Sequence, residues 1–131
     1  MNDDFAQVYT LRLTVGAHAA RHVRRIVRSY LTQWDMPALS DTVELGVTEL
    51  LANVVRHVPD RRCTVLLARR TGGVRVEVAD GCPRYPVRAT CVADDAEGGR
   101  GLVLLEAVAD KWGVAPGPGE GKTVWFECDS G

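Results

Sequence analysis

The chain has 131 residues, of which 46% are hydrophobic and 25% charged, an ordinary globular composition that excludes a disordered chain. Its 16 basic and 17 acidic side chains leave a net charge of −1, which excludes a strongly basic protein that binds nucleic acid directly. The length fits a single domain over residues 1–131, large enough to build a core without disulfides or metals.

The near-neutral charge is the sum of two unequal halves. Residues 1–75 contain 11 arginines and 7 acidic residues, a net charge of +4, whereas residues 76–131 carry a net charge of −5. Four arginines fall close together in the first half: Arg21, Arg24, Arg25 and Arg28. They form either a solvated helix face or a docking surface for an acidic protein partner.

Cysteine spacing and hydropathy indicate a reducing compartment. None of the four cysteines forms a C-x-x-C pair, and no Cys/His cluster has zinc spacing. The amino-terminal residues lack the apolar core of a signal peptide, and no apolar run approaches the roughly 18 residues of a membrane helix. We therefore expect a cytoplasmic protein with free thiols and no membrane partner.

The first half of the chain predicts one strand followed by two helices. Apolar and polar residues alternate over residues 7–13, which favours a strand with one buried face. Apolar residues at three- and four-residue steps predict a helix over residues 17–34, which ends before Pro37. Ser40 is the expected N-cap of a second helix that runs to His57.

The second half predicts a hairpin, a long loop, a helix and a last strand. Residues 64–70 and 74–79 are rich in β-branched residues and are joined by Thr-Gly-Gly, a hairpin signal. Residues 81–98 read as an irregular loop, residues 102–112 as a helix and residues 123–128 as a strand. This order indicates an α+β fold, a two-layer α/β sandwich whose mostly antiparallel sheet is covered on one face by helices.

The second helix carries polar residues at a spacing of four, which places Glu49, Asn53 and His57 along one face. A carboxylate can take or orient the proton of an attacking hydroxyl group, and a carboxamide oxygen suits Mg²⁺. The alternative is a polar helix face in water. His57 fits a helix-end cap better than a catalytic group, because it lies in the last turn.

Asp80 ends a hydrophobic strand and is followed by Gly81. A carboxylate beside an apolar pocket can accept a hydrogen bond from the amine of adenine, whereas the carbonyl of guanine would be repelled. The alternative is an aspartate that caps its own turn.

A glycine cluster, Gly98-Gly99-Arg100-Gly101, directly precedes a predicted helix. Glycines let backbone amides approach a phosphate at a helix N-terminus, and Arg100 adds positive charge. The cluster does not match the P-loop pattern, and by itself it is equally consistent with a flexible turn.

Taken together and in this order, the three motifs resemble the N, G1 and G2 boxes of the GHKL (Bergerat-fold) ATP-binding family. Residues 121–125 resemble the family's final strand, which closes the adenine pocket. The sequence is most similar to the anti-sigma factor serine/threonine kinase branch, small ATP-binding regulators of Gram-positive bacteria. The resemblance implies a single histidine-kinase-like ATPase (GHKL) domain over residues 1–131 with the Bergerat fold.

The resemblance also implies a role for each matching residue, with ATP and Mg²⁺ as cofactors. Glu49 would be the general base, and Asn53 would bind Mg²⁺ between the phosphates. The other nucleotide contacts would come from Asp80 and Gly81 at the adenine, Gly99, Arg100 and Gly101 at the phosphates, residues 82–98 as a lid, and Thr123 supporting Asp80.

The function that the resemblance implies is phosphorylation of Ser or Thr on an anti-anti-sigma (STAS-type) protein, together with sequestration of a sigma factor. Homodimers are common in this branch. The alternative is a non-catalytic, nucleotide-gated or degenerate adaptor that binds its partner by its surface. Cys82 and Glu97 stand where the family usually has small residues, and both bear on how tightly nucleotide binds.

Overall fold

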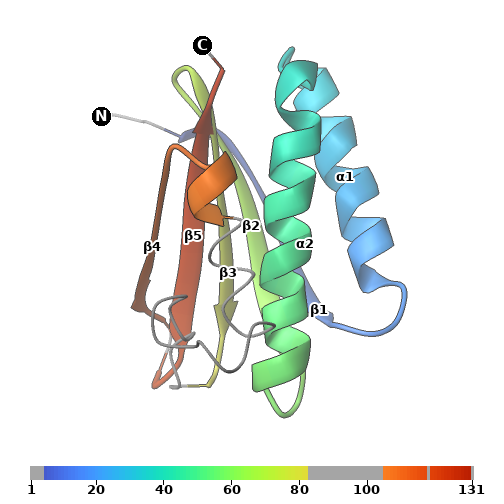
Figure 1. Ribbon diagram of the computed structural model, residues 1–131, viewed down its shortest axis with the longest axis vertical. Helices are drawn as coiled ribbons and strands as arrows, with labels where there is room; N and C mark the ends of the chain where they lie inside the picture. The colour runs from blue at the N-terminus through green and yellow to red at the C-terminus, as the bar shows by residue number, and fades with distance from the viewer. Residues whose placement is uncertain (1–4, 83–104, 118, 131) are drawn as a thin grey trace.

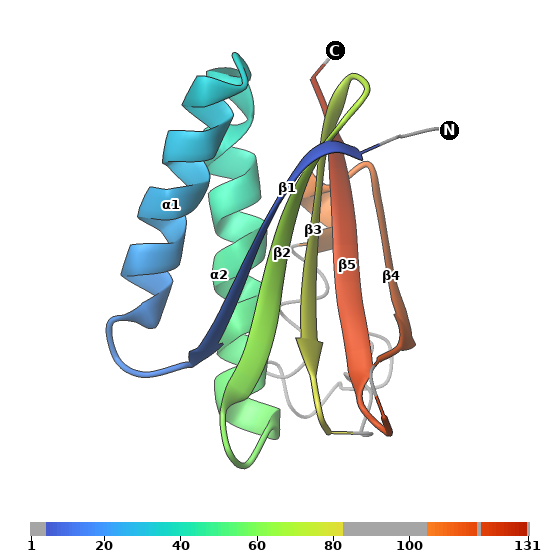
Figure 2. The same cartoon turned by 180° about the vertical axis from the view of Figure 1, so that it is seen from behind.

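The chain forms a five-stranded antiparallel sheet with two long helices against one face (Figure 1 and Figure 2). The computed structural model describes residues 5–82, 105–117 and 119–130. The strands are β1 (Phe5–Thr14), β2 (Arg62–Arg70), β3 (Gly73–Asp80), β4 (Lys111–Pro116) and β5 (Lys122–Asp129). They lie in the order β1-β2-β3-β5-β4, and the expected two-layer sandwich is confirmed.

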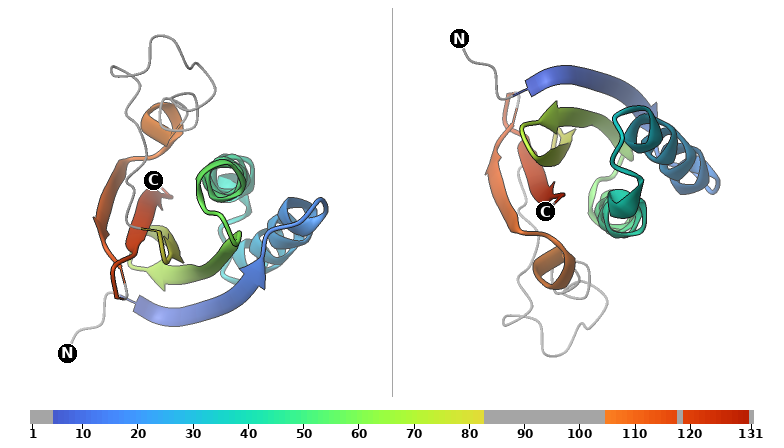
Figure 3. Two further views of the ribbon diagram at one scale, coloured as in Figure 1. Left: turned by 90° about the horizontal axis from the view of Figure 1, so that it is seen from below. Right: turned by 90° about the horizontal axis from the view of Figure 1, so that it is seen from above.

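The helices are α1 (Ala19–Gln33), a 3₁₀ turn η1 (Pro37–Leu39) and α2 (Ser40–His57), with a further helical turn at residues 105–108. Viewed end-on, the sheet curves around α2, while α1 lies toward the β1 side (Figure 3). Within the part of the chain that the structure describes, none of these helices combines the length and apolar character needed to cross a bilayer.

Alternation in the strands decides which side chains face the helices. In β3 the residues Val74, Val76 and Val78 are buried, and the same two-residue period brings Asp80 onto the buried face. In β5, Lys122 shares the buried face with Val124 and Phe126 in the same way. Both polar residues therefore point toward α2.

The helices complete the core with apolar residues at helical spacing. The buried residues of α1 are Val23, Val27 and Leu31, and those of α2 include Val43, Val47, Leu50, Leu51 and Val54. Such a one-sided apolar face is what holds a helix against a sheet.

The expected N-cap at Ser40 is wrong. The residue in the N-cap position is Leu39, because the 3₁₀ turn η1 leads directly into α2 and makes Ser40 the first helical residue. Ser40 is buried, and its hydroxyl has no hydrogen-bond partner among the described residues.

The predicted helix over residues 102–112 is too long at its carboxyl end. Helical structure is present at residues 105–108, residues 102–104 lie outside the described ranges, and Lys111 begins β4. Pairing with β5 outweighs helix propensity here, because Trp112 lies opposite Phe126 in an antiparallel ladder. Pro116, which cannot donate a ladder hydrogen bond, is tolerated at the end of this edge strand.

A glycine sets the distance between α2 and the sheet. A Cβ atom at Gly46 would lie 2.6 Å from the Cζ atom of Phe126, so the ring packs directly against the helix backbone. Both residues are buried.

Replacing Gly46→Ala should therefore destabilise the protein. The overpacking cost of about 1–3 kcal/mol equals or exceeds the helix-propensity gain of about 1 kcal/mol, and urea unfolding measures the difference. Gly16→Ala is the control, because a Cβ there meets nothing within 4 Å. A Phe126→Leu background should reduce the cost of Gly46→Ala, and an unchanged cost there would contradict the contact.

Candidate functional site

A narrow pocket lies between α2 and the ends of β3 and β5. Its lining residues are Leu50, Asn53, Val54, His57, Val78, Asp80, Lys122 and Val124. The α2 members follow the i, i+3, i+4, i+7 spacing of one helix face. The pocket thus has apolar walls and a small number of polar groups, as small-molecule sites usually do.

Asp80 is held in the pocket by two hydrogen bonds to one carboxylate oxygen. Its Oδ1 atom accepts from the backbone N–H of Cys82 at 2.8 Å and from the Nζ atom of Lys122 at 3.0 Å. The hydrogen bond from Cys82 forms the turn in which Asp80 caps its own backbone, as the alternative interpretation expected. Asp80 is also buried, as a residue inside a pocket would be. The two interpretations of Asp80 are therefore compatible.

Lys122 is the polar residue of the pocket lining for which the sequence predicted no individual role. It lies opposite Asp80 in the β3–β5 register, and the two side chains are each only 4% exposed. Its ammonium group also donates to the backbone carbonyl of Cys82 at 3.3 Å. The signal that could have found it is the two-residue period that also buries Val124 and Phe126.

Thr123, in contrast, is not among the residues that line the pocket. It pairs with Ala79 and Ala115, and strand alternation directs its side chain to the face opposite that of Lys122 and Val124. The structure therefore brings Lys122, and not Thr123, to Asp80.

Asn53 lies in the pocket with an incompletely satisfied amide. It is 8% exposed, its Oδ1 atom accepts a long 3.4 Å hydrogen bond from Arg56, and its Nδ2 atom has no partner among the described residues. The Oδ1 atom, with one long hydrogen bond and a second lone pair, is the atom of this amide that could ligate Mg²⁺. No group of three or more His, Cys, Asp or Glu side chains within the described ranges could hold a metal ion.

Glu49 lies one helical turn before Asn53 and outside the pocket lining. Its side chain is half-buried, and it forms no ion pair with any other described residue. His57 lines the pocket in the last turn of α2, and its backbone carbonyl accepts a weak hydrogen bond from the Sγ atom of Cys82 at 3.7 Å. The helix thus presents a carboxylate, an amide and an imidazole along one side.

The remaining expected nucleotide contacts divide between described and undescribed parts of the chain. Gly81 follows Asp80 directly, and a Cβ atom there would meet nothing within 4 Å. Gly99, Arg100 and Gly101 lie outside the described residues, as does the expected lid from residue 83 onward.

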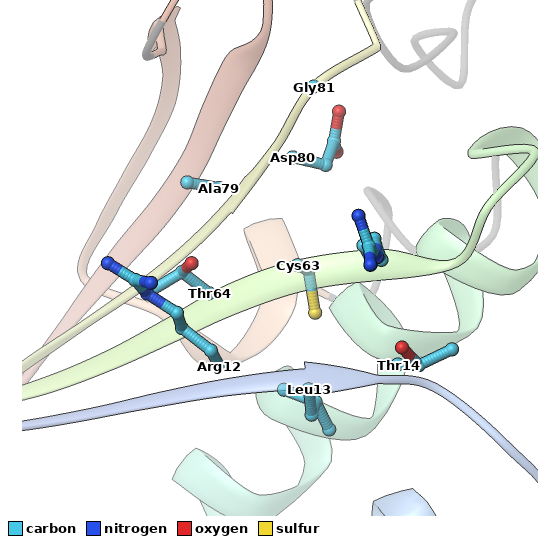
Figure 4. Close-up of a pocket in the computed structure, with 9 residues that line it drawn as sticks. Arg12, Leu13, Thr14, Cys63, Thr64, Ala79, Asp80 and Gly81 are labelled. Atoms are coloured by element: carbon cyan, nitrogen blue, oxygen red, sulfur yellow. The ribbon is translucent and has the colours of Figure 1, made fainter.

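A wider hollow lies where the ends of β1, β2 and β3 meet, with a volume of about 670 Å³ (Figure 4). Arg12 and Thr64, which pair across β1 and β2, line it together with Arg62. Cys63 comes between Arg62 and Thr64 and is buried. Burial, reinforced by the charge of Asp80, raises the pKa of the Cys63 thiol from 9.0 to about 12.

Cys128 is a second buried thiol of this kind, at the other end of the sheet. Burial, reinforced by the charges of Asp110 and Asp129, raises the pKa of Cys128 from 9.0 to about 12.

The arginine cluster of α1 divides into two pairs. Arg24 donates to the hydroxyl of Thr48 at 3.2 Å, and Arg28 lies 2.8 Å from a carboxylate oxygen of Glu44. These two arginines therefore connect α1 to α2. Arg21 and Arg25 are exposed, and Arg28 remains 58% exposed despite its ion pair, so these three fit the expected docking surface.

Comparison with known proteins identifies the family. The model of the histidine kinase-like ATPase domain matches residues 13–128, so the chain belongs to this family and the expected family is confirmed. Membership implies a domain that binds ATP. A comparison with curated proteins finds no match.

Two solved structures share the fold. The crystal structure of the RsbU and RsbW domains of Rv1364c from Mycobacterium tuberculosis has a TM-score of 0.66 and 21% identity, covering 92% of this chain and 32% of that chain. The SiaB-SiaC complex from Pseudomonas aeruginosa has a TM-score of 0.63 and 12% identity, covering 95% and 89%. At these identities the likeness shows the fold.

The raised thiol pKa values predict inert cysteines and an alkaline loss of stability. Cys63 and Cys128 should resist iodoacetamide at pH 8 in the folded protein and react after unfolding in urea, as peptide mass spectrometry would show. Equal labelling of both states would contradict their burial.

The same shifts predict how stability depends on pH. The folded thiols keep their protons to about pH 12, whereas unfolded thiols lose them near 9.0. The unfolded state therefore gains free energy of ionisation as the pH rises from 9.0 toward 12, and the free energy of unfolding falls. Replacing Cys63→Val and Cys128→Val together should flatten this fall in urea titrations, and an identical pH profile would contradict the prediction.

Proposed function

We propose that this protein is an ATP-binding regulator that resembles the anti-sigma factor kinases. It transfers the γ-phosphoryl group of ATP to a Ser or Thr of an anti-anti-sigma (STAS-type) partner and sequesters a sigma factor or similar protein. The observation that carries the proposal is the convergence of Asn53 and Asp80 on one apolar pocket, with Glu49 one turn away.

The pocket residues suit a purine. Leu50, Val54 and Val124 offer apolar surfaces to the faces of a flat base. Asp80 offers a buried carboxylate that could accept a hydrogen bond from the base amine, and its Oδ1 atom already accepts from Cys82 and Lys122. A carboxylate that is free to accept in this position would favour adenine, because it would repel the carbonyl oxygen of guanine.

The phosphates would lie toward Asn53 and the glycine cluster. Asn53 would give its amide oxygen to Mg²⁺, which when bound supplies neutralisation of the phosphate charge. Gly99 and Gly101 would offer backbone amides, and Arg100 a positive charge, as the motif suggests.

Glu49 would act as the general base. Its carboxylate is one turn from Asn53 on the same helix, and it accepts or orients the proton of the incoming hydroxyl group of the partner. Phosphoryl transfer requires positioning and charge neutralisation more than covalent chemistry, so a helix that carries both groups is a suitable support.

A protein partner is supported by the exposed arginines and by a structural neighbour. Arg21 and Arg25 give α1 an exposed positive surface, which would attract an acidic partner. SiaB, which shares this fold, is found in a complex with SiaC.

A second candidate function is a non-catalytic adaptor whose surface binds the partner. The Lys122–Asp80 ion pair favours it, because the carboxylate expected to read the base already has a charged partner. Thermal-shift titration with ATP and Mg²⁺ separates the two. No shift at millimolar ATP indicates a degenerate adaptor, and a shift without phosphate transfer indicates a nucleotide-gated one.

Replacing Glu49→Gln should lower phosphate transfer by about 10²- to 10⁴-fold while ATP binding stays nearly unchanged, because a general base acts in the transfer step. Transfer from γ-labelled ATP to purified STAS-domain proteins, tested one by one, measures the rate. Asp41→Asn is the matched control, since Asp41 is an exposed carboxylate two turns earlier on α2. Transfer at the wild-type rate in the Glu49 variant would remove this residue from the mechanism.

Reversing the charge of Arg21→Glu and Arg25→Glu should slow association with an acidic partner, on the order of tenfold at low salt. Stopped-flow association or surface plasmon resonance measures the rate. Arg12→Glu with Arg62→Glu is the matched control, a pair of exposed arginines at the ends of β1 and β2. Equal effects of the two double variants would argue against α1 as the docking surface.

A further inference from the structure

The Lys122 side chain is hydrogen-bonded to Asp80, the carboxylate that would bind a base amine under the proposed function. Its Nζ atom lies 3.0 Å from Oδ1 of Asp80 and 3.3 Å from the carbonyl oxygen of Cys82. Both side chains of the pair are 4% exposed. The carboxylate that would recognise the base is therefore already paired with a positive charge inside the protein.

With Lys122 in this position the pocket has almost no free space. The volume left among its lining residues is about 10 Å³, whereas a single water molecule requires roughly 10–15 Å³ by the same kind of measure. A purine ring, many times larger, enters only if a lining group moves.

The backbone around Lys122 packs closely against neighbouring backbone, whereas its side chain can rotate. A Cβ atom at Gly121 would lie 1.9 Å from the carbonyl oxygen of Asp80, which shows how closely β5 begins beside the end of β3. The backbone N–H of Gly117 donates to the carbonyl of Gly121 at 2.9 Å on the other side. The lysine side chain, by contrast, has four rotatable bonds.

We propose that Lys122 determines the nucleobase affinity and selectivity of this pocket, by competing with the base amine for Asp80 and by filling the base position. This inference rests on the proposed function, which assigns the pocket to a nucleotide. A base binds only when the ammonium group leaves Asp80, so the base adds little to the affinity of the wild-type protein. Removing the lysine exposes Asp80 to the amine of adenine and lets it repel the carbonyl oxygen of guanine.

The decisive variant is Lys122→Thr, with Lys111→Thr as its matched control. Lys111 is the other lysine of the chain, also begins a strand and is exposed. Electrostatics alone predicts weaker binding of the ATP anion when a positive charge is lost. The proposal predicts the opposite at position 122: ATP with Mg²⁺ should bind about tenfold tighter or more. This is the gain in affinity that corresponds to one additional hydrogen bond to a charged group.

Selectivity gives a second readout in the same titrations. The wild-type protein should bind ATP and GTP with similar affinity, and Lys122→Thr should gain affinity for ATP and not for GTP. Isothermal titration calorimetry of both nucleotides measures this, and the Lys111 variant should behave as the wild type.

Lys122→Thr leaves Asp80 without its charged partner, and this variant could fail to fold. A second variant and a measurement on the wild type keep the proposal testable in that case. Lys122→Gln keeps a long side chain that can donate to Asp80 without a charge, and it should bind ATP more tightly than the wild type does. The wild-type protein itself should bind inorganic tripolyphosphate with Mg²⁺ about as well as ATP, because the base stays outside the closed pocket.

The outcomes separate this inference from the proposed function. Tighter ATP binding by the Lys122 variants, with a new preference over GTP, supports the inference. Tight ATP binding by the wild type that is unchanged or weakened at Lys122 overturns it and leaves the proposed function standing. No nucleotide binding by any of the proteins overturns the nucleotide site itself and the inference with it.

Discussion

The close approach of the end of β3 to the start of β5 is the constraint on which the site depends. Gly121 permits it, since any side chain there would collide with the carbonyl of Asp80. The approach sets Asp80 opposite Lys122 in the register, and strand alternation turns both side chains toward α2. The carboxylate of Asp80 and the ammonium group of Lys122 thus face one another on the buried side of the sheet, where apolar side chains are usual.

The packing of α2 supplies the other wall of the pocket. Gly46 lets the helix lie against the Phe126 ring, and about two turns further on Asn53 and Val54 reach the space beside Asp80. Arg28, by its ion pair with Glu44, connects the outer helix to this same helix. The position of the polar groups is therefore a consequence of core packing, which tolerates small volume changes poorly.

The sequence was sufficient for those parts of the fold that depend on local pattern. The hairpin of β2 and β3 followed from two β-branched runs around Thr-Gly-Gly, and the four-residue spacing placed Glu49 and Asn53 along α2. Strand β4 could not be found in this way, because only its pairing with β5 distinguishes it from the end of a helix. The role of Lys122 could not be predicted for a related reason. Its partner Asp80 is 42 residues away in the sequence, and a lysine after Gly-Glu-Gly is typical of a turn.

Folding stability alone is a poor explanation for a lysine in this position. A buried ion pair loses about as much in desolvation as it gains in attraction, and apolar replacements are often neutral or stabilising. Breaking such a pair from one side costs about 3–5 kcal/mol, because it leaves a buried charge uncompensated. Asp80 with its Cys82 hydrogen bond still needs a donor at its carboxylate, which either a base amine or an internal ammonium group can provide. Under the proposed function, the ion pair would substitute for the ligand and keep the carboxylate satisfied while no base is bound. The free energy of base binding would then be a difference between two partners of Asp80.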